Sequence, residues 1–252
     1  MLIDNFEEIE DFMRFQFEDG LFFKFEALVR NTDGSNDLYE DGYSNTNKNI
    51  LIKSWYIDSP EYYVRAKKEM ITLCNMTGAR LYMTCDIKSN KRLIQTIVKE
   101  VNDMVVATLQ GSVFGIKKLN KLFSHCTSVV HSSEPSKKTL MFDIDVKDER
   151  VLKIVQDYLN WKSNLCVRNH VDGFYYVILD TKKGWHVIVT KKFDSSDWLD
   201  FAEERTFSIL HDKRSNERRE WIEENISMKP NQLCLVYMNN QNKNLTIKAC
   251  SC

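Results

Sequence analysis

Two aspartates, Asp143 and Asp145, carry the clearest chemical signal in the sequence, because they lie two positions apart in the mostly apolar run 140–146. This run predicts a strand over 139–146. Alternate side chains of a strand face the same way, so the two carboxylates share one face. Neighbouring carboxylates repel each other unless a cation compensates them, and their oxygens are ligands that Mg²⁺ and Mn²⁺ accept. The pair therefore predicts a divalent-metal site, although an acidic face on a half-exposed edge strand would give the same pattern.

A basic turn that leads into an apolar strand, residues 181–189, is the second signal. Lys182 and Lys183 can hold phosphate groups as point charges, and Gly184 would let a phosphate approach the backbone. His186 lies two residues past Gly184 on the same face of the predicted strand, where it can contact a phosphate or orient a metal-bound group. The segment predicts a phosphate-binding turn. An ordinary hairpin with a half-buried histidine is the alternative.

The two segments together resemble a known superfamily. A Phe-Asp-Ile-Asp strand at 142–145, followed by a Gly-Trp-His strand at 184–186, is similar to the DxD and x-His motifs of the archaeo-eukaryotic primase superfamily. Its members are the primase-polymerases of replicons, phages and plasmids. The specific motifs lie within 140–190, and a weaker similarity covers 50–95.

The resemblance implies a template-directed nucleotidyl transferase of the DNA primase or polymerase type. Asp143 and Asp145 would bind two divalent ions, Mg²⁺ or Mn²⁺, and would be catalytic together with His186. The residues implied to bind the phosphates of the nucleotide are Lys182, Lys183, Gly184 and His186, with Gly184 standing where the family often has serine. The implied partners are nucleoside triphosphates, a single-stranded DNA template and separate replication proteins such as a helicase.

The sequence departs from this family at the third acid. Members use a further carboxylate on a later strand, and the segment expected to supply it, 226–237, contains none. Ser227 and Asn231 occupy plausible positions for that acid. The carboxylates left as substitutes are Asp194, Glu223 and Glu224.

This departure keeps a second function class open, a non-catalytic nucleic-acid or partner-binding module on a degenerate primase fold. A third hypothesis is a metal-dependent nuclease, because Asp145-Val146-Lys147 also fits the acid-x-Lys pattern of that chemistry. In a regular strand Lys147 points the same way as Asp145, so strand geometry is compatible with this hypothesis.

Two other basic groups are candidates for contact with nucleic acid. Lys88, Lys91 and Arg92, with Tyr82 nearby, offer the mixture of cations and stacking surface that binds single strands, although a solvated helix start gives the same composition. Arg214, Arg218 and Arg219 alternate with glutamates, so we expect ion pairs within their own helix instead.

The composition bounds the fold and the class of protein. The chain has 252 residues and a formal net charge of −1, so no global positive field points to nucleic acid. With only 8 glycines and 3 prolines, a β-sandwich or barrel is disfavoured. Seven cysteines and no secretory signal predict free thiols in the cytoplasm. No apolar run approaches the roughly 18 residues of a membrane span, so no membrane partner is expected.

Predicted strands and helices alternate along the sequence and must position these residues. This alternation predicts an α+β fold, with mixed sheets flanked by helices. The strongest helix signal is a stripe that is expected to be buried: Ile94, Ile97, Val98, Val101, Met104 and Val105. Strands are also expected at 22–30, 50–57, 79–85, 173–180, 184–190, 233–237 and 245–249, and helices at 149–160, 196–210 and 214–224. A linker-like stretch near 135 divides the chain into an N-terminal α/β subdomain, 1–135, and a C-terminal subdomain, 136–252, that carries both motifs, unless the two form one composite domain.

Overall fold

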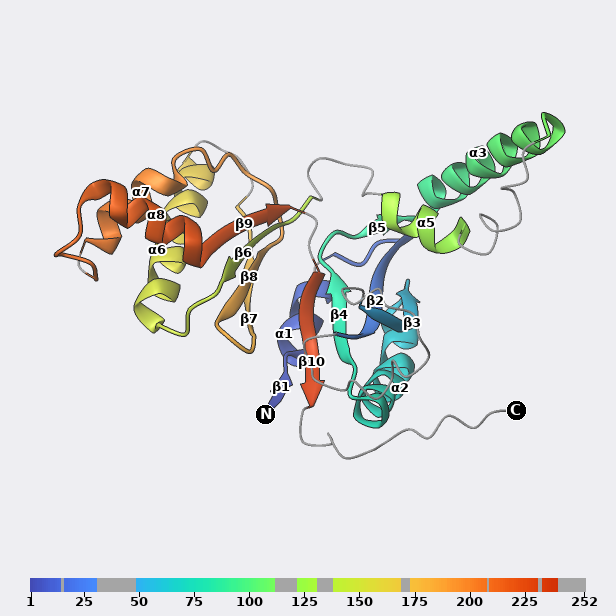
Figure 1. The fold of residues 1–252 in the computed structure, drawn as a ribbon, viewed down its shortest axis with the longest axis horizontal. Coiled ribbons are helices and arrows are strands. Elements are labelled where there is room, and N and C mark those ends of the chain that lie inside the picture. Colours follow the sequence, from blue (N-terminus) through green and yellow to red (C-terminus); the bar gives the residue numbers. More distant parts are fainter. Residues whose placement is uncertain are drawn as a thin grey trace.

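The computed structural model describes residues 1–14, 16–30, 49–111, 122–130, 138–168, 173–207, 209–230 and 233–239. Within these residues the chain mixes helices with two sheets whose strand pairings are all antiparallel. Figure 1 shows the two sheets side by side, each with its own helices. The expected α+β class is therefore confirmed, but the expectation of mixed sheets is wrong for the described residues, because each of their strand pairings is antiparallel.

The first sheet has the strand order β1-β10-β4-β2-β3, with β5 beside β2. Its strands are β1 (Leu2–Asp4), β2 (Leu21–Val29), β3 (Ile50–Ile57), β4 (Arg80–Thr84), β5 (Lys88–Ser89) and β10 (Leu233–Asn239). The central strand β2 reads LFFKFEALV and is buried on both faces over its first five residues, as expected of an aromatic-rich strand with neighbours on both sides.

Two helices cover one face of this sheet, α1 (Phe6–Arg14) and α2 (Pro60–Thr77). The bounds of α2 follow from local chemistry: Ser59 accepts a hydrogen bond from the Tyr62 amide, Pro60 begins the helix, and Gly78 ends it with φ of 66°. Two further helices that the structure describes in this half, α3 (Asn90–Leu109) and α5 (Leu122–Val129), pack with Phe22 at the start of β2.

The second sheet has the strand order β7-β8-β6-β9. Its elements follow one another as β6 (Leu140–Ile144), α6 (Glu149–Arg168), β7 (Tyr176–Asp180), β8 (Trp185–Val189), α7 (Trp198–Thr206), α8 (Ser215–Asn225) and β9 (Ile226–Pro230). With α7 and α8 serving as one crossover, this is the split βαβ arrangement, β-α-β-β-α-β. Its two central strands, β6 and β8, are the ones that carry the predicted chemistry.

The alternation of side chains gives the second sheet two different faces. Phe142, Ile144 and Val187 enter a core with α6, α7 and α8, the outer helical layer in Figure 1. Met141 and Ile188 point to the opposite face and join the core of the first sheet. The two sheets therefore share apolar contacts on the same face that carries Asp143 and His186.

Buried polar side chains also join the two halves. The Asn5 amide donates to the carbonyls of Asp180 and Leu235, both at 2.9 Å, and its oxygen accepts from the Asp180 amide at 2.9 Å. Asp86 accepts hydrogen bonds from the backbone and hydroxyl of Thr139, at 2.9 and 2.6 Å. These bonds are directional, so they fix how β7 and the start of β6 meet the first sheet.

The division of the chain between the sheets is not a simple cut near 135. That position and the strand expected at 245–249 lie outside the described residues. The strands before it belong to the first sheet and β6 to β9 to the second, but β10 returns to the first sheet and pairs with β1 and β4. The first sheet thus uses both ends of the described chain.

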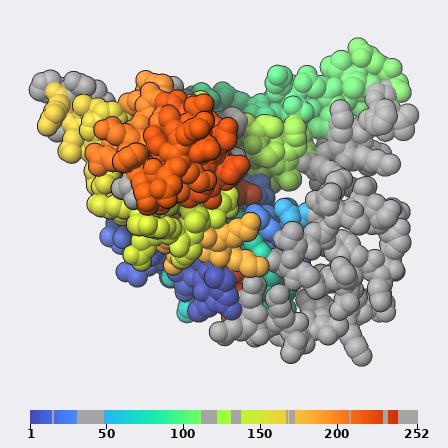
Figure 2. Space-filling view, turned by 60° about the vertical axis from the view of Figure 1, so that its left-hand side comes forward, coloured from blue at the N-terminus to red at the C-terminus, as the bar shows by residue number. Residues whose placement is uncertain are grey.

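Helix α3 forms as expected, but the expected burial of its apolar stripe is wrong for the described residues. Ile94, Val98 and Val105 are 62%, 54% and 52% exposed, and Leu93 is the residue of α3 that is buried. Figures 1 and 2 show α3 projecting from the body of the protein. The helical spacing of apolar residues indicates that one face of the helix is apolar. It does not indicate that another element of the same chain covers that face.

Candidate functional site

The candidate site is built on a row of residues that crosses three neighbouring strands. Asp143 of β6 is paired in register with His186 of β8 on one side and with Ser227 of β9 on the other. The His186 Nε2 atom lies 3.3 Å from Oδ1 of Asp143. Register pairing of adjacent strands thus brings together the two motifs that the sequence singled out.

Lys229 completes this group. It lies on β9 two residues after Ser227, and its long side chain reaches diagonally across to Asp143, where Nζ lies 2.7 Å from Oδ2. The sequence motifs do not include Lys229, because the sequence pattern predicts no strand over β9. The signal was the alternation Ile226-Ser227-Met228-Lys229, in which the apolar residues join the helical core.

The electrostatics of the group favour a charged Asp143. Its contact with His186, and then its hydrogen bond from Lys229, lower the pKa of Asp143 from 3.8 to about 2, although partial burial opposes the shift. The Asp143 and His186 side chains are 18% and 13% exposed, and Lys229 is 38% exposed. The Nδ1 atom of His186 is buried without a hydrogen-bond partner, so the contact with Asp143 orients the ring.

We expect Asp143→Asn to remove a pH-dependent part of the stability. Because the pKa of Asp143 is lowered on folding, its ionised form stabilises the fold above about pH 5, and this contribution is lost as the pH falls toward 2. After allowance for solvent screening it amounts to about 1 kcal/mol at neutral pH. Denaturant unfolding of both proteins at several pH values measures it. A difference in unfolding free energy that does not shrink between pH 5 and pH 3 would contradict the assignment.

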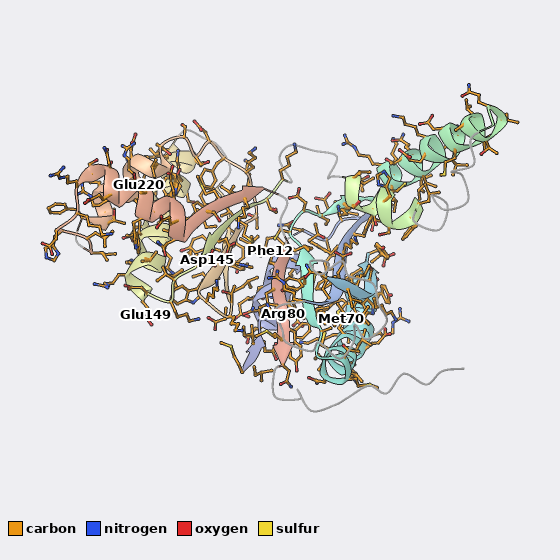
Figure 3. The ribbon with its side chains drawn as sticks, viewed as in Figure 1. Phe12, Met70, Arg80, Asp145, Glu149 and Glu220 are labelled. Atoms are coloured by element: carbon orange, nitrogen blue, oxygen red, sulfur yellow. The ribbon has the colours of Figure 1, made fainter. Side chains whose placement is uncertain are left out.

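Asp145 lies just beyond the end of β6, and not within the strand as expected. Strand β6 ends at Ile144, and the Asp145 amide donates to the Asn225 carbonyl at 2.8 Å, where α8 passes into β9. The Asp145 side chain is exposed at this corner (Figure 3). The two aspartates therefore combine a half-buried carboxylate on the strand with an exposed one just beyond it.

Lys147, the lysine of the acid-x-Lys pattern, extends toward the β7–β8 turn. Its ammonium lies 2.5 Å from Oδ1 of Asp180 and 4.5 Å from the centre of the Trp185 ring. The contacts of Lys147 are thus with Asp180 and Trp185, and they give the nuclease hypothesis no support.

The β7–β8 turn contains the predicted phosphate-binding residues. Lys182 and Lys183 are exposed there, and the Gly184 amide donates to the Thr181 hydroxyl at 3.0 Å. A Cβ atom on Gly184 would lie 1.9 Å from the Ile144 carbonyl oxygen. The backbone of β6 therefore approaches Gly184 so closely that only glycine fits there. The sequence pattern predicts instead that a phosphate makes this close approach.

The second predicted group, at the start of α3, divides in the structure. Lys91 and Arg92 are exposed, as a contact with nucleic acid requires. Lys88 is 3% exposed and donates to the Val130 carbonyl at 2.8 Å, and burial lowers its pKa. Lys88 therefore holds the end of α5 against β5, and it does not present its charge at the surface.

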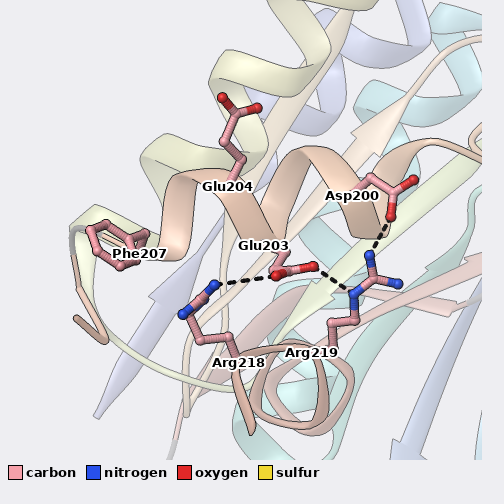
Figure 4. Close-up of a pocket in the computed structure, with 6 residues that line it drawn as sticks. All are labelled: Asp200, Glu203, Glu204, Phe207, Arg218 and Arg219. Atoms are coloured by element: carbon pink, nitrogen blue, oxygen red, sulfur yellow. Dashed lines mark hydrogen bonds and ion pairs between the residues drawn. The ribbon is translucent and has the colours of Figure 1, made fainter. Parts of the chain in front are cut away.

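A surface cavity of about 510 Å³ lies between α7 and α8, on the helical layer of the second sheet (Figure 4). Glu203 of α7 accepts from Nε of Arg219 at 2.6 Å and from Nη2 of Arg218 at 3.2 Å. Arg219 also contacts Asp200 at 2.5 Å. The expectation that these arginines pair within their own helix is wrong, because they tie α8 to α7. These charges compensate one another.

The site offers few oxygen donors to a divalent ion. Asp143 and Asp145 supply carboxylate oxygens, the donors that Mg²⁺ and Mn²⁺ accept. However, Asp143 already contacts an ammonium, and the residue opposite it on β9 is Ser227 instead of an acid. Across the described ranges, no three His, Cys, Asp or Glu side chains gather as they would around a metal ion.

Comparison with known proteins found no match among family models, curated proteins or solved structures. In the part of the chain that the structure describes, none of the helices combines the length and apolar character needed to cross a bilayer.

Proposed function

We propose that this protein is a primase-like nucleotidyl transferase, which joins nucleoside triphosphates on a DNA template with Mg²⁺ or Mn²⁺ as cofactor. One observation carries the proposal: Asp143 and His186, the central residues of the two motifs, face each other on adjacent strands at 3.3 Å. This arrangement supports the resemblance on which the sequence-based hypothesis rests, because motifs distant in the chain meet at one place. The proposal includes separate replication proteins, such as a helicase, as partners.

Each residue has a role in this proposal that follows from its position. Asp143 and Asp145 would hold the cation at the end of β6, where it would polarise an attacking hydroxyl and neutralise the leaving pyrophosphate. Asp143 also orients the His186 ring, whose contact with a phosphate oxygen would position the nucleotide. The exposed Lys182 and Lys183 would meet the phosphates as mobile point charges.

Calorimetric titration of the full chain with a nucleoside triphosphate and Mn²⁺ tests the proposal. We expect metal-dependent binding that weakens at least about tenfold in Asp143→Asn, because a neutral amide is a poorer cation ligand. Glu220→Gln, on the exposed face of α8, makes the same change of charge away from the site and should bind like the wild type. Binding that is equal in all three proteins would contradict the placement of the site.

The position of Lys229 favours a second candidate function, a nucleic-acid-binding module without catalysis. The ammonium contacts Asp143, and the described part of β9 carries no carboxylate that would serve as a third acid. This alternative predicts salt-sensitive binding of single-stranded DNA that EDTA does not change. Loss of that binding on adding EDTA would favour the transferase.

A further inference from the structure

We infer that the Lys229 ammonium supplies the positive charge that a second divalent ion would otherwise supply. The site therefore accepts one divalent ion only. This inference rests on the proposed function, because it concerns the same carboxylates. It goes beyond the resemblance, which implies two ions held with the help of a third acid.

The geometry gives Lys229 the position of a charge partner for Asp143. The two oxygens of the Asp143 carboxylate are divided between two neighbours, Oδ1 facing His186 at 3.3 Å and Oδ2 facing Lys229 at 2.7 Å. A divalent ion on Oδ2 would have to displace the ammonium or lie beside it, and two cations at that separation repel strongly.

The charges of the group lead to the same stoichiometry. Asp143 and Asp145 contribute two negative charges, and Lys229 returns one positive charge. One divalent ion then leaves the group with a net positive charge suited to a triphosphate, whereas two ions would concentrate five positive charges against two carboxylates. Because Lys229 is 38% exposed, its ammonium is accessible to a phosphate oxygen that approaches Asp143.

Counting bound Mn²⁺ tests this inference without any turnover. The full chain is titrated with Mn²⁺ alone, and the free ion is measured by its electron paramagnetic resonance signal. We expect no more than one ion per chain in the wild type. Lys229→Glu supplies the missing third acid, so it should bind Mn²⁺ at least about tenfold more tightly or take a second ion.

Two further variants separate the local effect from a general change of charge. Lys99→Glu makes the same change on the exposed surface of α3 and should bind Mn²⁺ like the wild type. Lys229→Met removes the ammonium without adding a ligand and should bind Mn²⁺ more tightly than the wild type, but less tightly than Lys229→Glu. Lys229→Met also provides the test if Lys229→Glu does not fold.

Two results would overturn the inference: two Mn²⁺ ions per wild-type chain, or Lys229 variants that bind no more tightly than Lys99→Glu. Neither result bears on whether nucleotides bind. Conversely, a gain of Mn²⁺ binding in Lys229→Glu, combined with a wild-type protein that binds no nucleotide, would support the role of Lys229 and contradict the proposed function.

Discussion

Gly184→Ala is expected to destabilise the protein by more than about 3 kcal/mol, which exceeds the usual cost of an overpacked side chain. The new Cβ would lie 1.9 Å from the Ile144 carbonyl oxygen and 2.9 Å from its carbonyl carbon. Both are backbone atoms of β6, so no side-chain rotation relieves the clash, and β8 must move away from β6. Thermal and denaturant unfolding measure the loss, which corresponds to a fall in melting temperature of roughly 6–12 °C for a chain of this size.

Gly78→Ala is the matched control for this prediction. Gly78 has a φ of 66° at the end of α2, and nothing lies within 4 Å of its added Cβ. Its replacement should therefore cost only about 1 kcal/mol, from backbone strain. If Gly184→Ala unfolded at the same temperature as Gly78→Ala or higher, the close contact between β6 and β8 would not exist in solution.

The same contact bears on the resemblance proposed from the sequence. That resemblance implies a position at Gly184 where serine is frequent, and a serine here would carry the same Cβ into the Ile144 carbonyl. The register Ile144 to Trp185, immediately beside this contact, also sets the register Asp143 to His186. The glycine therefore serves the alignment of the site as well as the fold.

The parts of the site that the sequence predicted are those set by local periodicity. An apolar run with alternating aspartates identifies β6, and a basic turn before an apolar run identifies β8. That His186 faces Asp143 depends on the register between strands separated by a helix and another strand, and no local pattern encodes it. The resemblance to a family suggested the encounter, and the structure provides the distance.

The parts that the sequence missed have identifiable physical causes. Strand β9 begins directly after α8, with no intervening turn, and it ends in a proline. The sequence pattern therefore assigns Lys229 to no helix or strand. Composition places Lys88 among the surface charges because it does not show burial, and the partner of Lys88, the Val130 carbonyl, lies far away in the sequence.

Asp143→Ala combined with Asp145→Ala is expected to reduce primer synthesis at least about 1,000-fold, because the change removes both carboxylate ligands of the cation that must offset the charge of the leaving pyrophosphate. The assay incubates the full chain with single-stranded DNA, nucleoside triphosphates and Mn²⁺, and measures extended products. Asp143 is paired with His186 of β8, and the Asp145 amide is bonded to the Asn225 carbonyl, so the double variant changes the surroundings of two backbone segments. Circular dichroism should therefore verify that the variant keeps its fold.

Glu61→Ala combined with Glu220→Ala removes two negative charges from exposed positions on α2 and α8 and should leave primer synthesis unchanged. A parallel reaction of the wild type with DNA and Mn²⁺, but without nucleotides, separates the transferase from a nuclease. Cleavage of the DNA in that reaction, lost in the Asp143 and Asp145 variant, would assign these carboxylates to hydrolysis. Primer synthesis that survives the loss of both aspartates would show that the facing motifs on β6 and β8 are not a transferase site, and would favour the binding module in which Lys229 neutralises Asp143.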